Sequence, residues 1–287
     1  MRRVGILLKR GKPEARELAA ELSRVLRAKG ASLHALAEDA DAIEGAAPVP
    51  ANRLGASIDA LAVLGGDGTF LYGAALVADH GVPIFGVNLG SLGFITPYAR
   101  AEAAAAIVEA AAGRLAIEER MRLAVAIRPA GKGPAARTAV PSAVNDAVIT
   151  QHVARLLDLE ARLDGAEVAL YKADGLIVAT PTGSTAYTLA AGGPILAPDL
   201  EAMVMTPICP HTLTHRPLVF RPDARLEIRN ASAGPVTLTI DGQSGHELGV
   251  GDAVEVRRAD QPLRLFRAPR GFFGVLREKL SWGERQG

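Results

Sequence analysis

The run Gly65-Gly66-Asp67-Gly68-Thr69 follows a candidate buried strand at Ile58–Leu64 and precedes a candidate helix at Thr69–Asp79. Three glycines in this short run allow a sharp turn and let a ligand approach the backbone closely. A loop that joins a parallel strand to a helix lies at the carboxyl end of a sheet, where open α/β folds bind their ligands. This run therefore predicts an α/β domain with a binding site at the loop.

The segments around this loop alternate between strand and helix patterns. Residues 37–57 show no clear period and are predicted to form a loop. Alternation of this kind predicts a parallel sheet covered on both faces, which is a doubly wound α/β domain over residues 1–118. The expected strands are Val4–Leu8, Ser32–Leu36 and Pro83–Val87, and the expected helices are Pro13–Lys29 and Glu102–Ala112.

From about residue 115 onward the patterns are mostly strand-like, with Gly, Pro and Asp between the runs. They predict a β-rich, sandwich-like second domain over residues 119–267, with the active site in the cleft between the domains. The amphipathic segment Gly271–Leu280 lies in the tail, residues 268–287, which is expected to pack back on the first domain. The clearest strand runs are Leu123–Ile127, Val144–Ile149, Leu156–Leu163, Leu176–Ala179, Leu226–Ile228, Val236–Ile240 and Val254–Val256.

Composition narrows the classes of partner. The 287 residues carry a net charge of +1, which gives no reason to expect nucleic acid or an acidic membrane surface. No apolar run reaches the length of a membrane span. The single cysteine excludes an internal disulfide and fits a reducing compartment, so a cytoplasmic protein is expected.

Asp67 is the informative residue of the glycine loop. A carboxylate in a phosphate-binding loop is repelled by the phosphate. It is expected there if it holds a divalent cation or accepts a proton from an attacking hydroxyl. Both roles indicate phosphoryl transfer, whereas the alternative is a simple helix cap. The loop is neither a Walker loop nor a dinucleotide fingerprint. It resembles a kinase superfamily that includes NAD kinases, 6-phosphofructokinases and diacylglycerol or sphingosine kinases.

A second motif runs from Asp174 to Tyr187, as a strand that enters a hydroxyl-rich turn. The hydroxyls in this turn suit ribose and phosphate oxygens, and they are more numerous than a helix cap needs. The ring of Tyr187 suits stacking on a base, or a place in the core. The hydroxyl residues are Thr180, Thr182, Ser184 and Thr185.

Across most of its length the chain resembles the bacterial NAD kinase family. The resemblance rests on strings that occur in family order: Gly65–Thr69, Asn88-Leu89-Gly90, Leu92-Gly93-Phe94, Asn145-Asp146, Asp174–Pro198, Thr206–His211 and Arg216–Val219. Two positions depart from the family pattern, because Asp146 stands where Glu is usual and Lys172 where Arg is common.

The resemblance implies transfer of the γ-phosphoryl of ATP, with a divalent metal expected to be magnesium, to the 2′-hydroxyl of the adenosine ribose of NAD. Asp67 would be the catalytic proton acceptor, Gly68 would approach the substrate, and no other side chain is assigned to the metal. The implied nucleotide-binding residues are Asn145 and Asp146 on the adenosine side, Arg155 and Lys172 at polar positions, Asp174 at the nicotinamide half, Thr185, Ala186, Tyr187, Thr188, Leu189 and Ala190 along the nucleotide, and Gln243 closing the site.

Several alternatives stay open from the sequence. The donor is ATP or polyphosphate, and Asp67 acts as base or metal holder. A lipid or sugar kinase of the same superfamily and a non-catalytic NAD-binding module are the competing functions. The resemblance also implies a homodimer or homotetramer, for which exposed strand edges would offer a contact surface.

Overall fold

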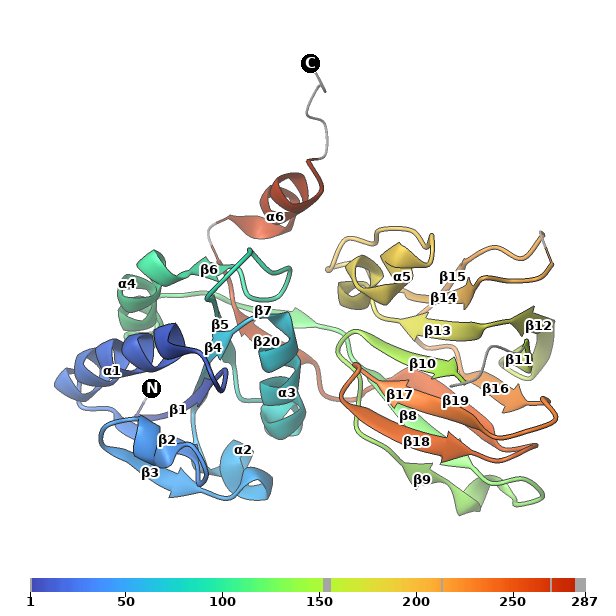
Figure 1. Ribbon diagram of the computed structural model, residues 1–287, viewed down its shortest axis with the longest axis horizontal. Helices are drawn as coiled ribbons and strands as arrows, with labels where there is room; N and C mark the ends of the chain where they lie inside the picture. Colours follow the sequence, from blue (N-terminus) through green and yellow to red (C-terminus); the bar gives the residue numbers. More distant parts are fainter. Residues whose placement is uncertain (1, 152–155, 213, 269, 282–287) are drawn as a thin grey trace. The chain divides into compact units, whose positions relative to one another are not determined.

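The computed structural model describes residues 2–151, 156–212, 214–268 and 270–281 (Figure 1). The chain divides into two units, one of Met1–Glu119 with Gln261–Gly287 and one of Arg120–Asp260. It returns to the first unit earlier than the expected boundary at residue 268, because β20 (Leu263–Phe266) joins the first sheet. Within the described ranges, no helix is long and apolar enough to cross a membrane.

The first unit is built on an eight-stranded sheet with the order β3-β2-β1-β4-β5-β20-β7, and β6 lies beside β5. Strands β1 to β5 run parallel, as the alternation of strand and helix predicted. The bounds are β1 (Arg3–Leu8), β2 (Ser32–Leu36), β3 (Ala46–Val49), β4 (Ala60–Gly65), β5 (Ile84–Asn88), β6 (Tyr98–Ala99) and β7 (Ile117–Arg120).

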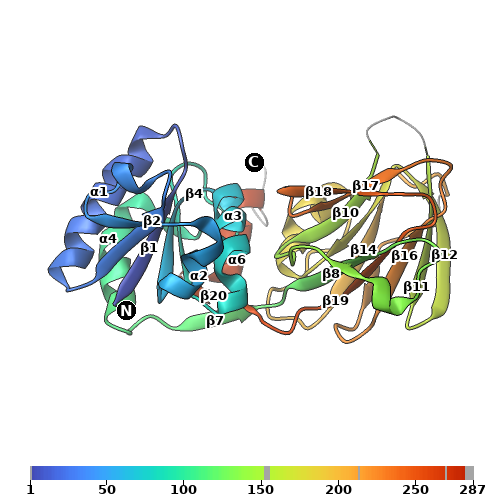
Figure 2. The same ribbon diagram turned by 90° about the horizontal axis from the view of Figure 1, so that it is seen from below.

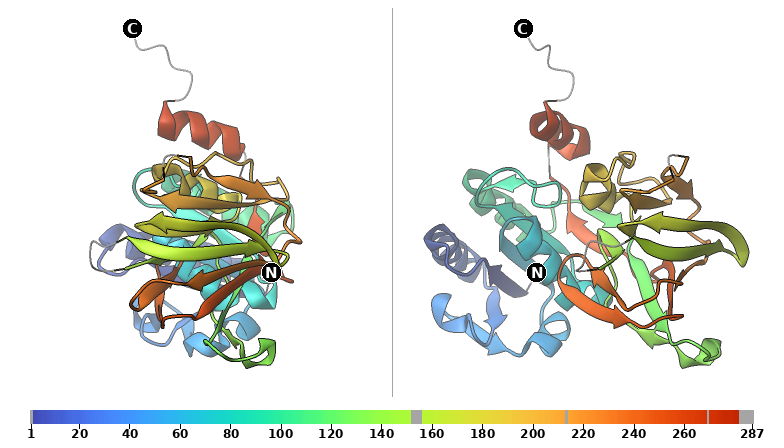
Figure 3. Two further views of the ribbon diagram at one scale, coloured as in Figure 1. Left: turned by 90° about the vertical axis from the view of Figure 1, so that its right-hand side faces the viewer. Right: turned by 45° about the vertical axis from the view of Figure 1, so that its right-hand side comes forward.

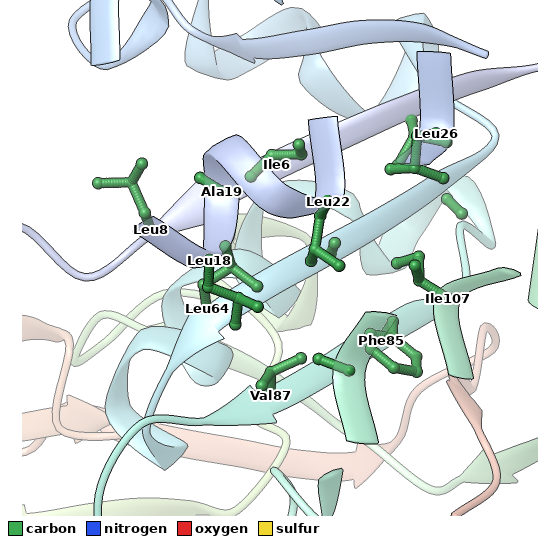
Figure 4. Packing of buried hydrophobic residues seen from close by; sticks show 14 of the residues in the cluster. Ile6, Leu8, Leu18, Ala19, Leu22, Leu26, Leu64, Phe85, Val87 and Ile107 are labelled. Atoms are coloured by element: carbon green, nitrogen blue, oxygen red, sulfur yellow. The ribbon is translucent and has the colours of Figure 1, made fainter. Parts of the chain in front are cut away.

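Helices cover both faces of this sheet, which confirms the doubly wound class (Figure 2). Helices α1 (Pro13–Ala28) and α4 (Arg100–Ala111) pack on one face, where Leu18 and Leu22 meet Leu64 and Phe85 (Figure 4). Helix α3 (Asp67–Val77) packs on the other face, where Gly73 lies against side chains of β1 and β4. Every residue of β4 is buried, as expected for a central parallel strand.

Local signals fix the ends of α1. Pro13 stands in the first turn, where its missing N–H costs nothing. At the other end Gly30 has a φ of +79°, its N–H donates to Arg27 O, and the Ala31 N–H donates to Leu26 O. These two bonds form a Schellman motif, which satisfies the last carbonyls of the helix.

The prediction of a loop over residues 37–57 is wrong. This stretch contains β3 and the short helix α2 (Leu54–Ser57), with 3₁₀ turns at Ala40–Ala42 and Ala51–Arg53. The strand pattern is hard to read because β3 is a short, half-exposed edge strand. An edge position also tolerates Pro48, which cannot donate to a neighbouring strand.

The second unit consists of two antiparallel six-stranded sheets, ordered β15-β14-β13-β10-β17-β18 and β12-β11-β16-β19-β8-β9 (Figure 3). Apolar residues from both sheets form one core, which confirms a sandwich. The bounds are β8 (Leu123–Arg128), β9 (Thr138–Ala139), β10 (Asp146–Thr150), β11 (Leu157–Leu163), β12 (Ala166–Ala173), β13 (Gly175–Ala179), β14 (Met203–Ile208), β15 (Leu218–Phe220), β16 (Leu226–Asn230), β17 (Val236–Ile240), β18 (Ser244–Leu248) and β19 (Ala253–Arg258).

Three further segments bear on the candidate site, and short 3₁₀ turns also occur at Ala78–His80 and Pro134–Ala136. A 3₁₀ turn at Thr182–Thr185 and helix α5 (Tyr187–Ala190) follow β13 in the second unit. Helix α6 (Gly271–Leu280) belongs to the first unit, and its Val275 and Leu276 are buried. For the described helix Gly271–Leu280, the expected packing on the body is therefore confirmed.

Candidate functional site

The glycine loop lies where the sheet of the first unit changes winding direction. Strand β1 continues outward to β2 and β3, whereas β4 and β5 lie on its other side. The carboxyl ends of β1 and β4 are adjacent, and the Lys9 N–H donates to Leu64 O over 2.8 Å. Open α/β sheets bind ligands in the crevice at this switch point.

The segment Gly93–Thr96 surrounds the side chain of Asp67. The Phe94 N–H donates to Asp67 Oδ2 over 3.0 Å, while the Thr96 hydroxyl and the Ile95 N–H donate to Oδ1 over 2.8 and 3.4 Å. Asn88 in turn donates to Thr96 Oγ1 over 3.0 Å. An ionised carboxylate has about four acceptor positions, so these three donors leave about one for a ligand.

Glycines around Asp67 serve two different purposes. A Cβ at Gly93 would overlap Asp67 Oδ1 and Thr96 Oγ1, so packing requires glycine there. At Gly66 and Gly68 an added Cβ would meet no described heavy atom within 4 Å apart from those of the adjacent residues and the backbone of the same helix. Packing does not demand glycine at these two positions, and a ligand can approach the backbone there at the start of α3.

A pocket of about 420 Å³ opens beside these glycines within the first unit. The Arg10 guanidinium in its wall pairs with Asp39 over 3.0 Å and with Glu38 over 2.9 Å. Those carboxylates raise the pKa of Arg10 and hold its side chain in place. The lining residues are Leu7, Leu8, Lys9, Arg10, Asp39, Gly66, Gly68, Thr69 and Tyr72, so two cationic side chains and the positive start of α3 face one space.

In the second unit three strand ends meet at one edge of a sheet, which we call the strand-end cluster. It consists of Asn145 and Asp146 at the start of β10, the turn after β13, and Asp241 after β17. The Asp241 carboxylate accepts hydrogen bonds from the N–H groups of Val144, Asn145 and Asp146 over 2.7, 2.7 and 3.0 Å. Asp241 therefore fixes the backbone that carries the Asn145-Asp146 pair.

Asp146 is 6% exposed, and burial followed by the charge of Asp241 raises the pKa of Asp146 to about 7. Burial raises the pKa of Asp241 as well, but its three N–H donors and the buried Arg122 favour the charged form. Asp241 therefore keeps the negative charge of the pair, and Asp146 takes up the proton first. Asp146 changes its charge close to neutral pH.

The hydroxyls of the turn after β13 are mostly engaged within the protein. Thr180 Oγ1 donates to Val144 O and accepts from the Gly183 N–H, and Ser184 Oγ donates to Pro181 O and accepts from the Leu196 N–H. Both side chains are fully buried. The interpretation that these two hydroxyls face ribose or phosphate is wrong, because Thr180 ties the turn to Val144 just before β10 and Ser184 ties it to Pro181 and Leu196. Thr185 Oγ1, which is partly buried, donates to Thr182 O over 3.1 Å.

The predicted nucleotide residues that follow this turn differ in exposure. Tyr187 is 44% exposed and Ala190 is exposed, whereas Thr185, Ala186 and Leu189 are partly buried. Thr188 is fully buried, so its side chain packs inside the unit. Gln243 is exposed beyond Asp241, where its N–H closes the turn on Ile240 O over 2.8 Å.

Lys172 and Asp174 lie away from the strand-end cluster. They precede β13, while the hydroxyl-rich turn follows it, so about 20 Å of extended chain separates Asp174 from Thr180. Both side chains are exposed, and the Lys172 ammonium pairs with Asp158 over 3.0 Å. Arg155, the remaining predicted residue, lies outside the described residues.

The described part of the chain contains no group of three or more His, Cys, Asp or Glu that could hold a metal by itself. Magnesium is commonly held by one or two carboxylates together with substrate phosphates. Asp67, whose neighbours Gly66 and Gly68 line the 420 Å³ pocket, fits that arrangement as a single carboxylate ligand only if its remaining acceptor position is not used for a proton.

Sequence reasoning missed three contributors to these sites. Lys9 and Arg10 directly follow a predicted strand. Their place at the carboxyl end of β1 was the sequence signal that could have indicated them as site residues. Asp241 was read only as part of Asp241-Gly242-Gln243, although Asp-Gly is typical of hairpin turns. Its φ of +51° confirms the turn, but its long-range acceptor role depends on tertiary structure.

Family models match both units. The model described as the ATP-NAD kinase N-terminal domain matches residues 4–114, and the ATP-NAD kinase C-terminal domain matches residues 144–268. A relative named NAD kinase from Geotalea daltonii is 42% identical over 99% of this chain and 100% of its own length. Another NAD kinase, from Koribacter versatilis, is 42% identical over the full length of both chains.

Solved structures share the fold. The yeast NADH kinase complexed with NADH superposes with a TM-score of 0.91 at 27% identity, covering 100% of this chain and 89% of that one. An NAD kinase from Archaeoglobus fulgidus in complex with ATP has a TM-score of 0.77 at 23% identity, covering 96% of this chain and 99% of that one. At that identity the second likeness supports the fold alone.

Proposed function

The chain belongs to the NAD kinase family, and from that premise we propose that it transfers the γ-phosphoryl group of ATP to the 2′-hydroxyl of the adenosine ribose of NAD. Family membership makes it a phosphotransferase acting on NAD, in place of a lipid kinase, a sugar kinase or a passive NAD-binding module. The donor and the roles of single residues are proposals.

The observation that carries the proposal is the placement of Asp67. Its carboxylate lies at the start of α3, at the switch point of a doubly wound sheet, with about one acceptor position left. In the proposed reaction this position accepts the proton of the 2′-hydroxyl while the oxygen attacks the γ-phosphorus and the bond to the β-phosphate breaks. Gly66 and Gly68 leave room for the reacting groups.

The pocket next to the glycine loop suits the phosphates of the donor. Lys9, Arg10 and the first N–H groups of α3 face it, and all of them favour an anion. Tyr72 in the pocket wall is 39% exposed, so its ring is available to a donor base. A base contact would favour ATP over polyphosphate. A bound magnesium would supply charge neutralisation on the phosphates.

The strand-end cluster suits the adenosine side of NAD. The partly buried Asn145 offers an amide donor and acceptor, and its backbone is fixed by Asp241. With a pKa of about 7, Asp146 can present either a hydroxyl donor or a carboxylate acceptor to the ribose. Asp146 is one methylene shorter than the Glu usual in the family, so its reach depends on this rigid backbone.

The direct test is the formation of NADP from NAD with ATP and magnesium. Asp67→Asn keeps the shape and loses the proton acceptor, whereas Asp41→Asn, at an exposed position, is the matched control. We expect Asp67→Asn to lose at least a hundredfold in kcat and Asp41→Asn to behave as wild type. Equal activity of wild type and Asp67→Asn would refute the proposal. Polyphosphate in place of ATP measures donor choice.

We further infer that a homo-oligomer completes the NAD site. Asp174 and Lys172 lie near the start of β13, whereas Asn145 lies beside the other end of that strand. Within one unit, the residues predicted for the nicotinamide half and for the adenosine side of NAD are therefore far apart. A second copy of the chain can present its own Asp174 at the strand-end cluster of the first. In a closed symmetric dimer the reciprocal contact then forms automatically.

Mixing variants tests this arrangement. Asn145→Ala and Asp174→Ala are each expected to be nearly inactive, and random re-association of the two gives mixed dimers with one intact site. About a quarter of wild-type activity should return on mixing. Activity that stays at the level of the separate variants would show that one chain supplies both residues.

A further inference from the structure

Helix α6 contacts the segment that holds Asp67. The ring of Phe272 lies 6.4 Å from the ring of Phe94, measured between centroids, and the Lys279 ammonium lies 4.9 Å from the centroid of Phe94. Phe272 also packs edge-on against Phe273 at 5.3 Å. Phe94 therefore meets a ring and a cation from the same helix.

A second link joins the same two parts of the chain. Tyr98 is buried, with 1% of the residue exposed. Its hydroxyl donates to Arg267 O, just before α6, over 2.6 Å. The segment from Phe94 to Tyr98 is thus tied to the chain around α6 at both ends. On its inner side this segment supplies the three hydrogen bonds to Asp67 that come from Phe94, Ile95 and Thr96.

These contacts form a continuous path from α6 to the predicted base. Phe94 takes part twice, because its ring contacts Phe272 and Lys279 while its N–H donates to Asp67 Oδ2. Gly93 has no side chain of its own with which to hold the segment, since a Cβ would overlap Asp67. At the Phe94 end of the segment, the ring contact with α6 therefore anchors the backbone on its outer side.

We propose that Phe272 and Lys279 of α6 are positioning residues, which hold Phe94 so that its N–H fixes the orientation of the Asp67 carboxylate. This inference rests on the proposed role of Asp67 in phosphoryl transfer. Small displacements of a reacting group reduce rates strongly, because the group must be aligned before the transition state forms. We expect the change to act on the alignment of Asp67 and not on the affinity for NAD, so the effect should fall on kcat.

The experiment compares Phe272→Ala with Phe272→Tyr in the full chain, with Leu280→Ala as the matched control. Leu280 is 42% exposed on the same helix, and its truncation also removes a large apolar side chain. Steady-state kinetics give kcat and the KM for NAD, and hydrogen–deuterium exchange of the peptide spanning residues 91–98 reports the anchor without requiring activity. Lys279→Met and Lys279→Arg form a second pair.

For Phe272→Ala we expect faster exchange in residues 91–98, a three- to tenfold fall in kcat and a KM for NAD within twofold of wild type. Phe272→Tyr keeps the ring and should restore both readouts, and Lys279→Met should lower kcat about twofold while Lys279→Arg does not. Unchanged exchange in Phe272→Ala would overturn the anchor. Faster exchange with unchanged kcat in an active enzyme would overturn the positioning of Asp67. An inactive wild type would instead refute the proposed function, which the exchange readout does not need.

Discussion

Replacing Asp146 by Asn should change the stability of the protein in a pH-dependent way. The Asp146 side chain is buried, and its pKa of about 7 compares with an ordinary value of 3.8. The folded state therefore keeps the proton on Asp146 at pH values where the unfolded chain has lost it. Stability falls as the pH rises from about 4 to about 7, and it stays reduced above pH 7.

The size of the effect follows from the shift. About three pKa units at 1.36 kcal/mol each give roughly 4 kcal/mol, which is an upper value because Asp146 and Asp241 titrate as a pair. We expect Asp146→Asn to be about 2–4 kcal/mol more stable than wild type at pH 8 and nearly equal to it at pH 4. For a unit of this size that corresponds to roughly 5–15 °C in the midpoint of thermal unfolding.

Thermal unfolding followed by circular dichroism between pH 4 and pH 8 measures this difference. Asp199→Asn is the matched control, because Asp199 is an exposed carboxylate in the same unit. The control should follow the wild-type curve at every pH. A constant difference between Asp146→Asn and wild type from pH 4 to pH 8 would refute the assignment of the raised pKa to Asp146.

Four further substitutions test the two sites and the core. Gly68→Ala meets no clash, and alanine stabilises a helix position by at most about 1 kcal/mol relative to glycine. The midpoint of thermal unfolding should therefore be unchanged or higher. In steady-state assays kcat/KM for NAD should fall at least tenfold. Arg10→Met should raise the KM for ATP several-fold and leave the KM for NAD within twofold, because Arg10 lines the pocket that we propose for the donor phosphates. Asp241→Ala leaves three N–H groups without their acceptor and should lower the free energy of unfolding by about 3 kcal/mol or more in urea titrations. Leu22→Ala in the core of the first unit should cost about 2–5 kcal/mol in the same titrations, with unchanged kcat for the folded enzyme.

Much of the first unit could be predicted because its signals are local. Pro13 at the start and Gly30 after the end predict the bounds of α1 to within one residue. The continuous apolar run of β4 indicates a buried parallel strand. Edge strand β3 was missed because half-exposed alanines and a proline carry no period. In the second unit β12, β14 and β18 were missed for a related reason. Their polar, proline-containing or short runs become strands through pairing with distant neighbours.

The glycine loop and the strand-end cluster also differ in how local their signals are. This difference explains why the interpretation of the Thr180 and Ser184 hydroxyls was wrong. In the glycine loop, Asp67 and the glycines that leave space beside it are neighbours in sequence. A short string of residues was therefore enough to predict the site. In the strand-end cluster the hydroxyls of Thr180 and Ser184 resembled ligand contacts, yet they bond to Val144 O, Pro181 O and the Leu196 N–H. A hydroxyl-rich turn closes on itself or on a ligand with the same residue types, because each hydroxyl both donates and accepts. Only burial separates the two outcomes, and burial is decided by β10 pairing with β13 on one side and with β17 on the other.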